Sequence, residues 1–416
     1  DRTALPRLGL PQLDGLLRPT TLYLAAPGAD SYSHHGYLAS HRGRLYAAWS
    51  NHARDEDAPG QRVRGSFSFD CGASWGPAVE LFPPLNTVKP RTEQDFVHDI
   101  VLIPNGFAEV EDTLYVVAEA HTLGERVSLS PPASEADEPA EIICFTRPGL
   151  GRLARAIGMD VGGALVLGPI FWLNGHPPAP LPGFPAYPSA ADPAFAGIAA
   201  AINAWQAQPE HLPTWDFSHQ TATLWAPDGH LLCEPTQAWQ LPDGTLARLW
   251  RDQAGVCGLL YVQFGSADGR RWTAPVRSAF PDAHTRAAAG NLPDGTAYII
   301  NNPGQRQVQR STSGGVEQLF TGRDPLVLSL AKDGLNFDRH AVIAAGAPPS
   351  RFAGVAKSCG FQYPHAAVTN DTLWVIYSVN KEDIEVVGIP LSSLLDHLFK
   401  TAGNCRSIST QQEESM

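Results

Sequence analysis

The sequence predicts an all-β protein, a seven-bladed β-propeller, with a six-bladed propeller as the second choice. Residues 68–75 read Ser-Phe-Asp-Cys-Gly-Ala-Ser-Trp, an Asp-box of the pattern S-x-D-x-G-x-x-W. In this hairpin turn the Asp accepts backbone N–H groups, the Gly adopts a positive φ and the Trp packs on the sheet. Looser copies occur at residues 266–272 and 331–337. Three related turns predict a repeated hairpin unit, as in the blades of a propeller.

Composition and length fit this fold. The 416 residues include 36 Pro, 38 Gly and 10 Trp, which favours turns and aromatic packing over long helices. At roughly 50–60 residues for each four-stranded blade, the length corresponds to about seven blades. Apolar segments separated by polar turns, several of them Asp-Gly, recur through the chain and predict hairpins. These hairpins cover residues 36–50, 99–119, 221–232, 236–250, 287–300 and 366–378.

We expect a single domain over residues 1–400, because each blade packs mainly on its neighbours and the ring closes as a unit. Residues 176–213 form an inserted segment rich in Pro and Ala, in which residues 193–206 are the best helix candidate. Residues 128–139 are polar, acidic and rich in Pro, which predicts an exposed loop. The polar residues 401–416 predict a disordered tail.

The net charge of −12 argues against nucleic acid as a partner, because phosphate binding needs a basic field. No apolar run reaches the length of a membrane span. The chain starts at Asp1 and not at Met, and it carries one glycosylation sequon at Asn370. We therefore expect a processed protein, secreted or periplasmic, that acts as a monomer. Six Cys are too few for a disulfide scaffold.

The strand pattern predicts a polar rim at one mouth of the propeller. In a blade, the residue that opens the first strand lies beside the residue that closes the antiparallel second strand. Loops converge at such a mouth, and ligands commonly bind there. The expected rim residues are Ser33, His34 and His35 with Asn51 and His52, His98 with His121, Cys233 and Glu234 with Arg251 and Asp252, Arg286 with Asn301 and Asn302, and Tyr363, Pro364 and His365 with Asn380 and Lys381.

The imidazole, guanidinium and amide groups of this rim suit an anionic sugar. Arg binds a carboxylate through two N–H groups, and His exchanges protons near neutral pH. Glu234 and Asp252 do not form a clear acid/base couple, which disfavours glycoside hydrolysis by two carboxylates. β-Elimination from a uronic acid fits better, because it needs a neutralised carboxylate, a base for the C5 proton and an acid for the leaving O4.

This chemistry requires no cofactor, although a structural divalent cation, Ca²⁺ or Zn²⁺, is compatible with the sequence. The chain has no nucleophile elbow, Walker loop or dinucleotide fingerprint. The His and Cys residues considered as metal ligands lack ligand spacing, so buried structural roles are the preferred interpretation. These residues are Cys233, Cys359, His219, His230 and His365.

Beyond the Asp-box, the stretches 33–36 with 49–51, 234–235 through 251–252, 280–283, 301–303 and 363–365 through 379–383 carry a family pattern. Together they resemble the sialidase-like propeller enzymes that include ulvan lyases and the rhamnose–glucuronate lyases and rhamnosidases acting on plant gum. The resemblance covers roughly residues 30–395. It implies a His pair, matched by His98 and His121, and an Arg that neutralises the substrate carboxylate, matched by Arg251.

Two features depart from known patterns. The lyases carry a Tyr on the hairpin of the Arg, and residues 233–236 read Cys-Glu-Pro-Thr. True sialidases have an Arg triad with an early Arg-Ile-Pro segment, and a Tyr/Glu pair. No Arg-Ile-Pro segment occurs in this sequence, so sialidase activity is disfavoured despite the Asp-boxes.

The leading hypothesis is a polysaccharide lyase that cleaves a bond at glucuronate in a rhamnose-containing acidic polysaccharide. Its catalytic residues are His98, His121 and Arg251. The expected substrate-binding residues are His34, His35, Glu234, Arg286, Asn301, Asn302, Tyr363 and His365. One alternative is a glycoside hydrolase such as an α-L-rhamnosidase, with a site centred on His34 or His35. The other is a non-catalytic propeller that binds carbohydrate.

Overall fold

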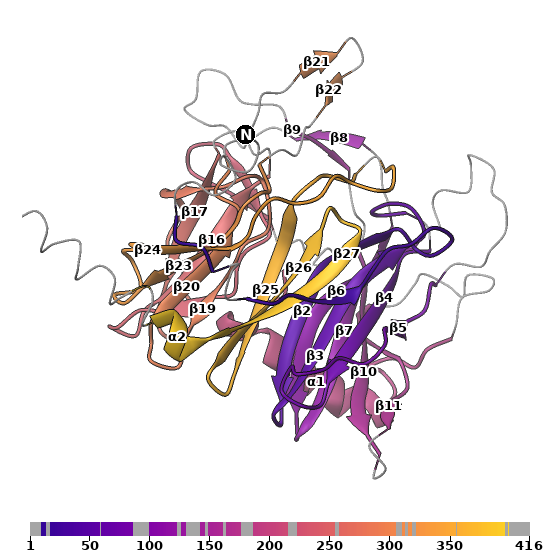
Figure 1. Cartoon of the computed structure of the whole chain (residues 1–416). Coiled ribbons are helices and arrows are strands. Elements are labelled where there is room, and N and C mark those ends of the chain that lie inside the picture. Colours follow the sequence, from indigo (N-terminus) through magenta and orange to yellow (C-terminus); the bar gives the residue numbers. More distant parts are fainter. Residues whose placement is uncertain are drawn as a thin grey trace, which may run out of the picture.

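The structure is a computed structural model, and it is mostly β (Figure 1). It describes residues 10–13, 17–58, 60–85, 100–122, 126–129, 142–145, 149–160, 164–175, 186–214, 223–253, 258–304, 310–312, 315–317, 322–354, 356–395 and 398. No helix in these ranges is long and apolar enough to cross a membrane.

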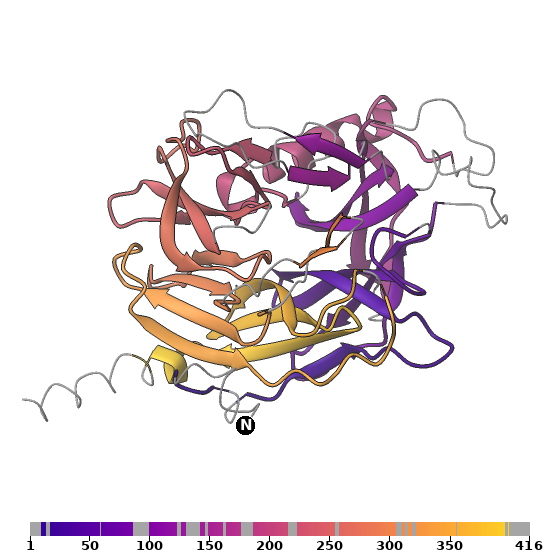
Figure 2. The same ribbon diagram turned by 90° about the horizontal axis from the view of Figure 1, so that it is seen from above.

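Five antiparallel sheets of four to six strands are found in the described ranges, and they surround a common centre (Figure 2). The first sheet contains β2 (Tyr32–His41), β3 (Arg44–His52), β4 (Arg62–Ser68) and β5 (Val79–Phe82). The second contains β6 (Ile100–Val110), β7 (Thr113–Thr122), β10 (Gly149–Met159) and β11 (Leu165–Leu167), with β12 (Phe171–Gly175) also paired to β10.

The other three sheets follow in chain order. The third contains β13 (Thr223–Trp225), β14 (Leu231–Cys233), β15 (Trp239–Gln240), β16 (Leu246–Asp252), β17 (Leu259–Gly265) and β18 (Val276–Pro281). The fourth contains β19 (Ala288–Asn291), β20 (Ala297–Asn301), β23 (Leu326–Ala331) and β24 (Arg339–Ala344). The fifth contains β25 (Phe361–Thr369), β26 (Thr372–Val379), β27 (Asp383–Pro390) and β1 (Thr20–Tyr23).

The fifth sheet joins the two ends of the propeller chain. Strand β1, from the beginning of the sequence, pairs with β27, so that Thr20 lies opposite Val386. The short helix α2 (Leu391–Leu395) follows β27 directly. Strands from both ends of the chain therefore share one sheet, which closes the ring as expected for a propeller.

Part of the chain forms inserted hairpins and a helix, whereas the estimate of seven blades from the chain length assigned all residues to blades. Two small hairpins stand at the same end of the molecule, at the top of Figure 1. They are β8 (Arg126–Leu129) with β9 (Ile142–Phe145), and β21 (Arg310–Thr312) with β22 (Gly315–Glu317). The described ranges thus hold five large sheets where the sequence count expected seven blades. Most of the predicted loop 128–139 and the predicted tail 401–416 lie outside these ranges.

The predicted helix in the inserted segment is confirmed as α1 (Pro193–Gln206), and the 3₁₀-helix η3 (Pro209–His211) follows it. Asp192 caps α1 by accepting a hydrogen bond from Ala194 N at 2.9 Å, and Pro193 occupies the first helical position. Ala199 and Ile202 are buried against Phe171 of β12. Helix α1 therefore covers the face of the second sheet that is turned away from the first sheet.

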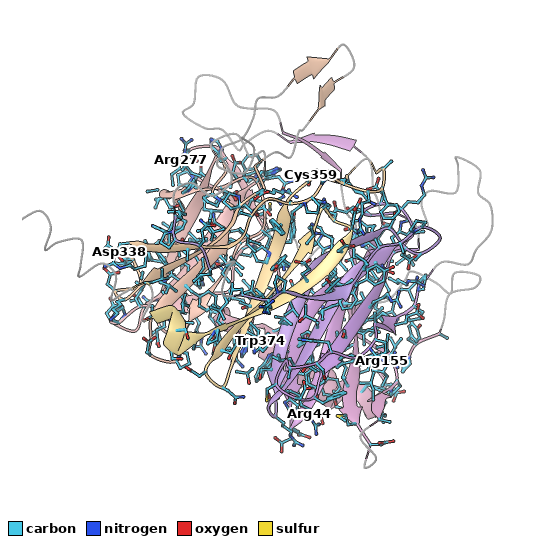
Figure 3. The ribbon with its side chains drawn as sticks, in the orientation of Figure 1. Arg44, Arg155, Arg277, Asp338, Cys359 and Trp374 are labelled. Carbon is cyan, nitrogen blue, oxygen red and sulfur yellow. The ribbon has the colours of Figure 1, made fainter. Side chains whose placement is uncertain are left out.

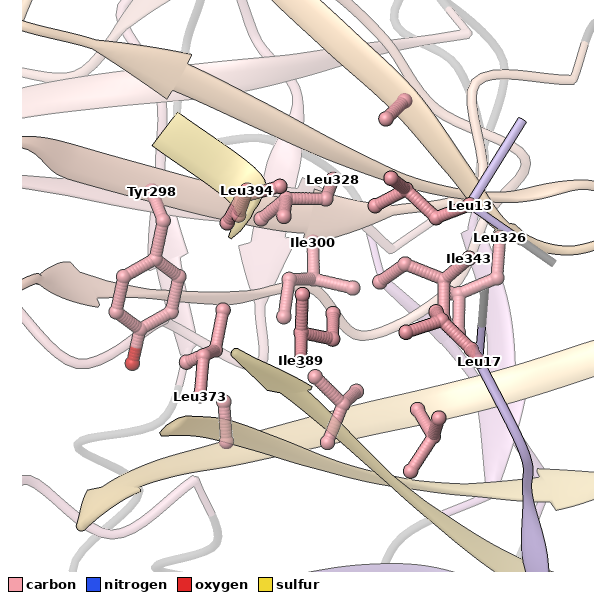
Figure 4. Packing of buried hydrophobic residues seen from close by; sticks show 14 of the residues in the cluster. Leu13, Leu17, Tyr298, Ile300, Leu326, Leu328, Ile343, Leu373, Ile389 and Leu394 are labelled. Atoms are coloured by element: carbon pink, nitrogen blue, oxygen red, sulfur yellow. The ribbon is translucent and has the colours of Figure 1, made fainter. Parts of the chain in front are cut away.

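Apolar side chains fill the space between neighbouring sheets. Between the fourth and fifth sheets, Ile300 and Leu328 pack with Leu373 and Ile389 (Figure 4). Similar clusters lie between the first and second sheets and between the third and fourth. Because central strands are covered on both faces, their sequences are nearly continuous apolar runs, which explains why alternation in the sequence is only partial.

The Asp-box has the structural role that the sequence predicts. Ser68 Oγ and Ser74 N each donate to Asp70 Oδ1 at 2.8 Å, and Gly72 has a φ of +90°. Ser74 Oγ also donates to Asp70 Oδ2 at 2.6 Å, and this hydrogen bond, with the two others, lowers the pKa of Asp70 to about 2. The turn belongs to the first sheet, but Gly72 lies against Trp374 of β26, which is labelled in Figure 3. The Asp-box therefore helps to join the first sheet to the fifth.

This contact predicts an unusually large loss of stability for Gly72→Ala. A Cβ on Gly72 would lie 2.0 Å from Trp374 Cη2, in addition to the strain of a positive φ. Thermal and urea unfolding should show a loss of about 2–4 kcal/mol. Gly43→Ala is the matched control, because Gly43 also has a positive φ, +73°, but its Cβ would meet nothing within 4 Å. A loss for Gly72→Ala no larger than the control's loss of about 1 kcal/mol would contradict the contact.

Candidate functional site

Local breaks in the inner strands direct side chains toward the centre of the ring. In β2 the register jumps between His34 and Tyr37, and in β25 between Gln362 and His365. Each jump contains a residue with positive φ, His35 at 55° and Tyr363 at 53°. Such a β-bulge interrupts the alternation of side chains and redirects them. Glu234, directly after β14, has the same kind of backbone, with φ of 49°.

The bulges bring Tyr363, Glu234 and Arg251 together at the centre. Arg251 NH1 donates to the Tyr363 hydroxyl at 2.6 Å and lies 2.7 Å from Glu234 Oε2. The Tyr363 hydroxyl in turn donates to Glu234 Oε1 at 3.1 Å. All three side chains are buried. A phenol thus contacts a carboxylate that can accept its proton and a guanidinium that stabilises negative charge.

Burial sets the protonation states of this trio. Desolvation raises the pKa of Tyr363 above its ordinary value, although Arg251 opposes the shift. Desolvation acts against the charge on Arg251, but Cys233 and Glu234 raise its pKa well above the ordinary value. Arg251 is therefore a fixed cation, and Tyr363 is a neutral phenol at neutral pH. Tyr363 can become a nucleophile only if its proton passes to a base such as Glu234.

Two further arginines support Tyr363. The Arg323 Cζ atom lies 5.5 Å from the centroid of the Tyr363 ring, and Arg323 NH1 donates to Gln362 Oε1 at 2.6 Å. Arg286 NH2 donates to Gly36 O at 2.7 Å and lies 3.3 Å from Tyr363 O. Arg286 was predicted to contact substrate, but its described hydrogen bonds hold backbone carbonyls of two bulges. Arg323 was not identified in the sequence, since it lies outside the hairpin rim.

His34 and His35 lie beside the Tyr363 ring. Their ring centroids are 4.2 Å and 5.4 Å from the centroid of the Tyr363 ring. His35 Nε2 lies 3.0 Å from Glu56 Oε1, and Lys381 Nζ forms an ion pair with the other oxygen of Glu56. Glu56 was missed in the sequence analysis. The acidic run at residues 55–57, which directly follows a strand that ends at the rim, is a signal that could have identified it.

The predicted His pair is placed only in part. His98 lies outside the described residues. His121 closes β7 and is fully buried, with Nε2 3.6 Å from Asp57 Oδ1. Asp57 also contributes to the electrostatic field at His35, whose pKa is lowered mainly by burial. His121 therefore belongs to the acidic side of the rim, whereas Arg251 contacts Tyr363.

The remaining predicted binding residues contact the backbone. Asn301 Nδ2 donates to Pro281 O at 2.7 Å, and Asn302 Nδ2 donates to Phe361 O at 2.9 Å. His365 Nδ1 accepts from Leu38 N at 3.2 Å. These side chains hold adjacent sheets together near the centre, and their part in binding substrate stays a prediction.

The candidate metal ligands from the sequence do not assemble in the described part of the chain, and His219 lies outside it. His230 Nδ1 pairs with Asp252 Oδ2 at 3.2 Å, which raises the pKa of His230. Burial raises the pKa of Cys233 to about 12, and Cys359 is exposed. A different set, His34, His35 and Glu56, places its potential ligand atoms within 4.8 Å of one another.

Comparison with known proteins shows the fold. Residues 200–376 match the family of BNR repeat-like domains. A solved sialidase has a TM-score of 0.64 and 21% identity, with 91% of this chain and 34% of that chain covered. A Trypanosoma rangeli sialidase in complex with the inhibitor DANA has a TM-score of 0.50 and 10% identity, covering 93% and 62%. No curated protein matches the chain.

These likenesses identify a sialidase-like propeller. The propeller of sialidases has six blades, which favours the six-bladed fold, the second choice from the sequence, over the seven-bladed fold. The chain spans about a third of the first sialidase and less than two thirds of the second. The all-β prediction and the resemblance to sialidase-like propellers are confirmed at this level.

Asp282 makes the free energy of unfolding depend on pH. Burial raises its pKa from 3.8 to about 7, although Arg251 opposes the shift. The folded protein thus binds this proton more tightly than the unfolded chain, so the contribution of Asp282 to stability falls as pH rises from about 4 to 7. This fall amounts to up to about 4 kcal/mol in the free energy of unfolding. The Asp282→Asn variant has no proton to lose at this position, so the fall should be absent in it.

The measurement is the difference in unfolding midpoint between Asp282→Asn and the wild type across this pH range. The difference should grow in favour of the variant as pH rises, because the other titrating groups are common to both proteins. The control is Asp338→Asn, which removes an exposed carboxylate labelled in Figure 3. Its difference in unfolding midpoint from the wild type should be nearly constant. A constant difference for Asp282→Asn as well would contradict the assignment.

Proposed function

We propose that the chain is a glycoside hydrolase of the sialidase type, which removes a terminal acidic sugar from a glycan with Tyr363 as the nucleophile. The observation that carries this proposal is the contact of the Tyr363 hydroxyl with both Arg251 NH1, at 2.6 Å, and Glu234 Oε1, at 3.1 Å. Sialidases are the glycosidases that use a Tyr nucleophile in place of a second carboxylate.

The charges around Tyr363 suit a sugar whose carboxylate lies on the anomeric carbon, as in a sialic acid. A carboxylate nucleophile would be repelled by that group, whereas a neutral phenol can approach it. Arg251 and Arg323, both buried beside Tyr363, supply positive charge for the substrate carboxylate. The Tyr/Glu pair consists of Tyr363 and Glu234. It was not recognised in the sequence, because the two residues come from different sheets.

In the proposed reaction, Tyr363 Oη forms a bond to the anomeric carbon while its proton passes to Glu234. The glycosidic C–O bond breaks, and its oxygen leaves with a proton from an acid. Asp57 is the candidate for that acid, because it lies on the β3–β4 connection at the rim and contacts His121. Water then gives a proton to Asp57 and attacks the anomeric carbon, which breaks the bond to Tyr363 Oη, and Tyr363 recovers its proton from Glu234.

The lyase predicted from the sequence is the second candidate. The Tyr expected on the hairpin of Arg251 is supplied instead by β25, with its hydroxyl 2.6 Å from Arg251 NH1. In that reaction Arg251 neutralises a uronate carboxylate, and Tyr363 with His121 transfers the protons. The substrate would then be an acidic polysaccharide containing glucuronate.

The role of Tyr363 is tested by Tyr363→Phe, which removes the nucleophilic oxygen but keeps the ring. We expect kcat to fall at least about 10³-fold, measured with a fluorogenic sialoside. Glu234→Gln should cause a smaller but clear loss, because the proton acceptor is weakened. Tyr298→Phe, in the apolar cluster between the fourth and fifth sheets, is the control and should leave turnover unchanged. Full activity in Tyr363→Phe would exclude the proposed nucleophile.

The two candidate reactions are separated by their products. A hydrolase releases the fluorophore from a sialoside and forms no unsaturated sugar. A lyase acting on ulvan or gum arabic produces an unsaturated uronate, which absorbs in the ultraviolet. Release of rhamnose without this absorbance would favour a rhamnosidase. Glycan binding without any product would support a non-catalytic binding protein and contradict both reactions.

A further inference from the structure

We propose that His34, His35 and Glu56 bind a divalent transition-metal ion, Zn²⁺ by ligand type, beside Tyr363. We call this group the histidine-pair site. The proposal does not depend on the hydrolase reaction, since it concerns binding of the ion in the absence of substrate. Two imidazoles and one carboxylate are a ligand set found in zinc sites that keep an open coordination position.

The β-bulge in β2 creates the site. Successive residues of a regular strand point to opposite faces, but the positive φ of His35 lets both rings lie together, with centroids 4.4 Å apart. His34 is fully buried and His35 is 3% exposed. With Glu56, their potential ligand atoms all lie within 4.8 Å of one another. The three groups are thus close enough to converge on one ion with small side-chain movements.

Two serines orient the imidazoles. His34 Nδ1 lies 2.6 Å from Ser378 Oγ, and His35 Nδ1 lies 3.0 Å from Ser50 Oγ. In both rings the Nδ1 edge is therefore engaged by a serine. Nε2 of His34 remains for a ligand, and Nε2 of His35 faces Glu56, the third member of the site. Metal-binding histidines are commonly held by such a hydrogen bond to the second ring nitrogen.

The hydrogen bonds of Ser378 are compatible with a proton on Nδ1 of His34. Ser378 Oγ lies 2.6 Å from His34 Nδ1 and 3.4 Å from Gln362 O, so it can accept from His34 Nδ1–H and donate to Gln362 O. In this tautomer Nε2 carries a lone pair, and this buried atom has no hydrogen-bond partner among the described residues. A buried lone pair without a donor is costly, and a metal ion would satisfy it.

Neutral imidazoles are the form that binds metal. Burial, together with the neighbouring cations, lowers the pKa of His34 well below its ordinary value, and burial lowers that of His35. His35 Nε2 now faces Glu56 Oε1 and carries the proton of that hydrogen bond. On metal binding this proton would move to His35 Nδ1, where Ser50 Oγ can accept it, so no net proton is released.

Lys381 sets the affinity of the histidine-pair site. Its ammonium group pairs with Glu56 Oε2, which leaves Oε1 for the ion. It also repels a second cation, as does Arg323, whereas Asp57 adds negative charge. Lys381→Met should therefore tighten metal binding, at least about 10-fold. A purely structural hydrogen-bond network predicts no such gain.

The experiment is calorimetric titration of the chelator-treated full chain with Zn²⁺, repeated with Co²⁺ to record the visible spectrum of the bound ion. We expect one ion per chain with a Kd below about 1 µM. His34→Gln and Glu56→Gln should each weaken binding at least about 100-fold, and Ser378→Ala about 10–100-fold. His340→Gln, on β24 of the fourth sheet, removes a histidine elsewhere and should leave binding unchanged.

Circular dichroism of each variant shows whether it folds. If neither His34→Gln nor Glu56→Gln folds, Ser378→Ala still tests the proposal. Absence of stoichiometric binding to the wild type would overturn the proposal, as would wild-type affinity in the folded ligand variants. Because no substrate is present, this result is independent of the outcome for Tyr363→Phe.

Discussion

One buried guanidinium holds the two bulges on which the candidate site depends. A bulge removes carbonyl groups from the strand ladder, and buried carbonyls need other donors. Arg286 NH2 donates to Gly36 O at 2.7 Å and lies 3.3 Å from Tyr363 O and Pro364 O. Its Cζ atom is 4.7 Å from the centroid of the Tyr37 ring. Arg286, two residues before β19 of the fourth sheet, thereby fixes the backbone from which the first and fifth sheets present His35 and Tyr363.

The site is a concentration of buried charge, which a protein does not build for stability alone. Arg251 faces Glu234, and Lys381 faces Glu56, so the cations have carboxylate partners. Removing ions from water costs several kcal/mol for each ion, and their mutual attraction often does no more than offset that cost. Apolar residues would fill the same space at least as well. Placement of these charges around a phenol is the arrangement expected where charge develops during a reaction.

The sequence was most informative where structure is local. The Asp-box at residues 68–75 and the helix 193–206 depend on residues close in the chain, and both are confirmed. The hairpin rule also placed Glu234 and Arg251 side by side, since Glu234 directly follows β14 and Arg251 lies on the adjacent strand β16. The blade count was less secure, because a length estimate cannot separate blade strands from inserted hairpins and helices.

The site itself could be predicted only in part. Tyr363 was identified as a rim residue, but its contact with Glu234 spans two sheets and has no signature in residue spacing. Arg323 and Glu56 lie outside the hairpins, and only the three-dimensional arrangement brings them to the centre. The absence of an early Arg-Ile-Pro segment gave no indication of the Tyr/Glu pair with an adjacent Arg that the structure contains, and whether that absence excludes sialidase activity stays untested.

The pairing of β1 with β27 has a consequence for how the protein is made. Thr20 and Thr21 find their partners at Val386 and Glu385, near the opposite end of the chain. During synthesis the ribosome delivers β1 long before the strand it joins. The ring can therefore close only after residues 383–390 have left the ribosome, and until then β1 and the edge of the fifth sheet remain unpaired. Closure of this fold is therefore a late step, and a nascent chain with its β1 edge still open is the form most exposed to wrong strand pairing.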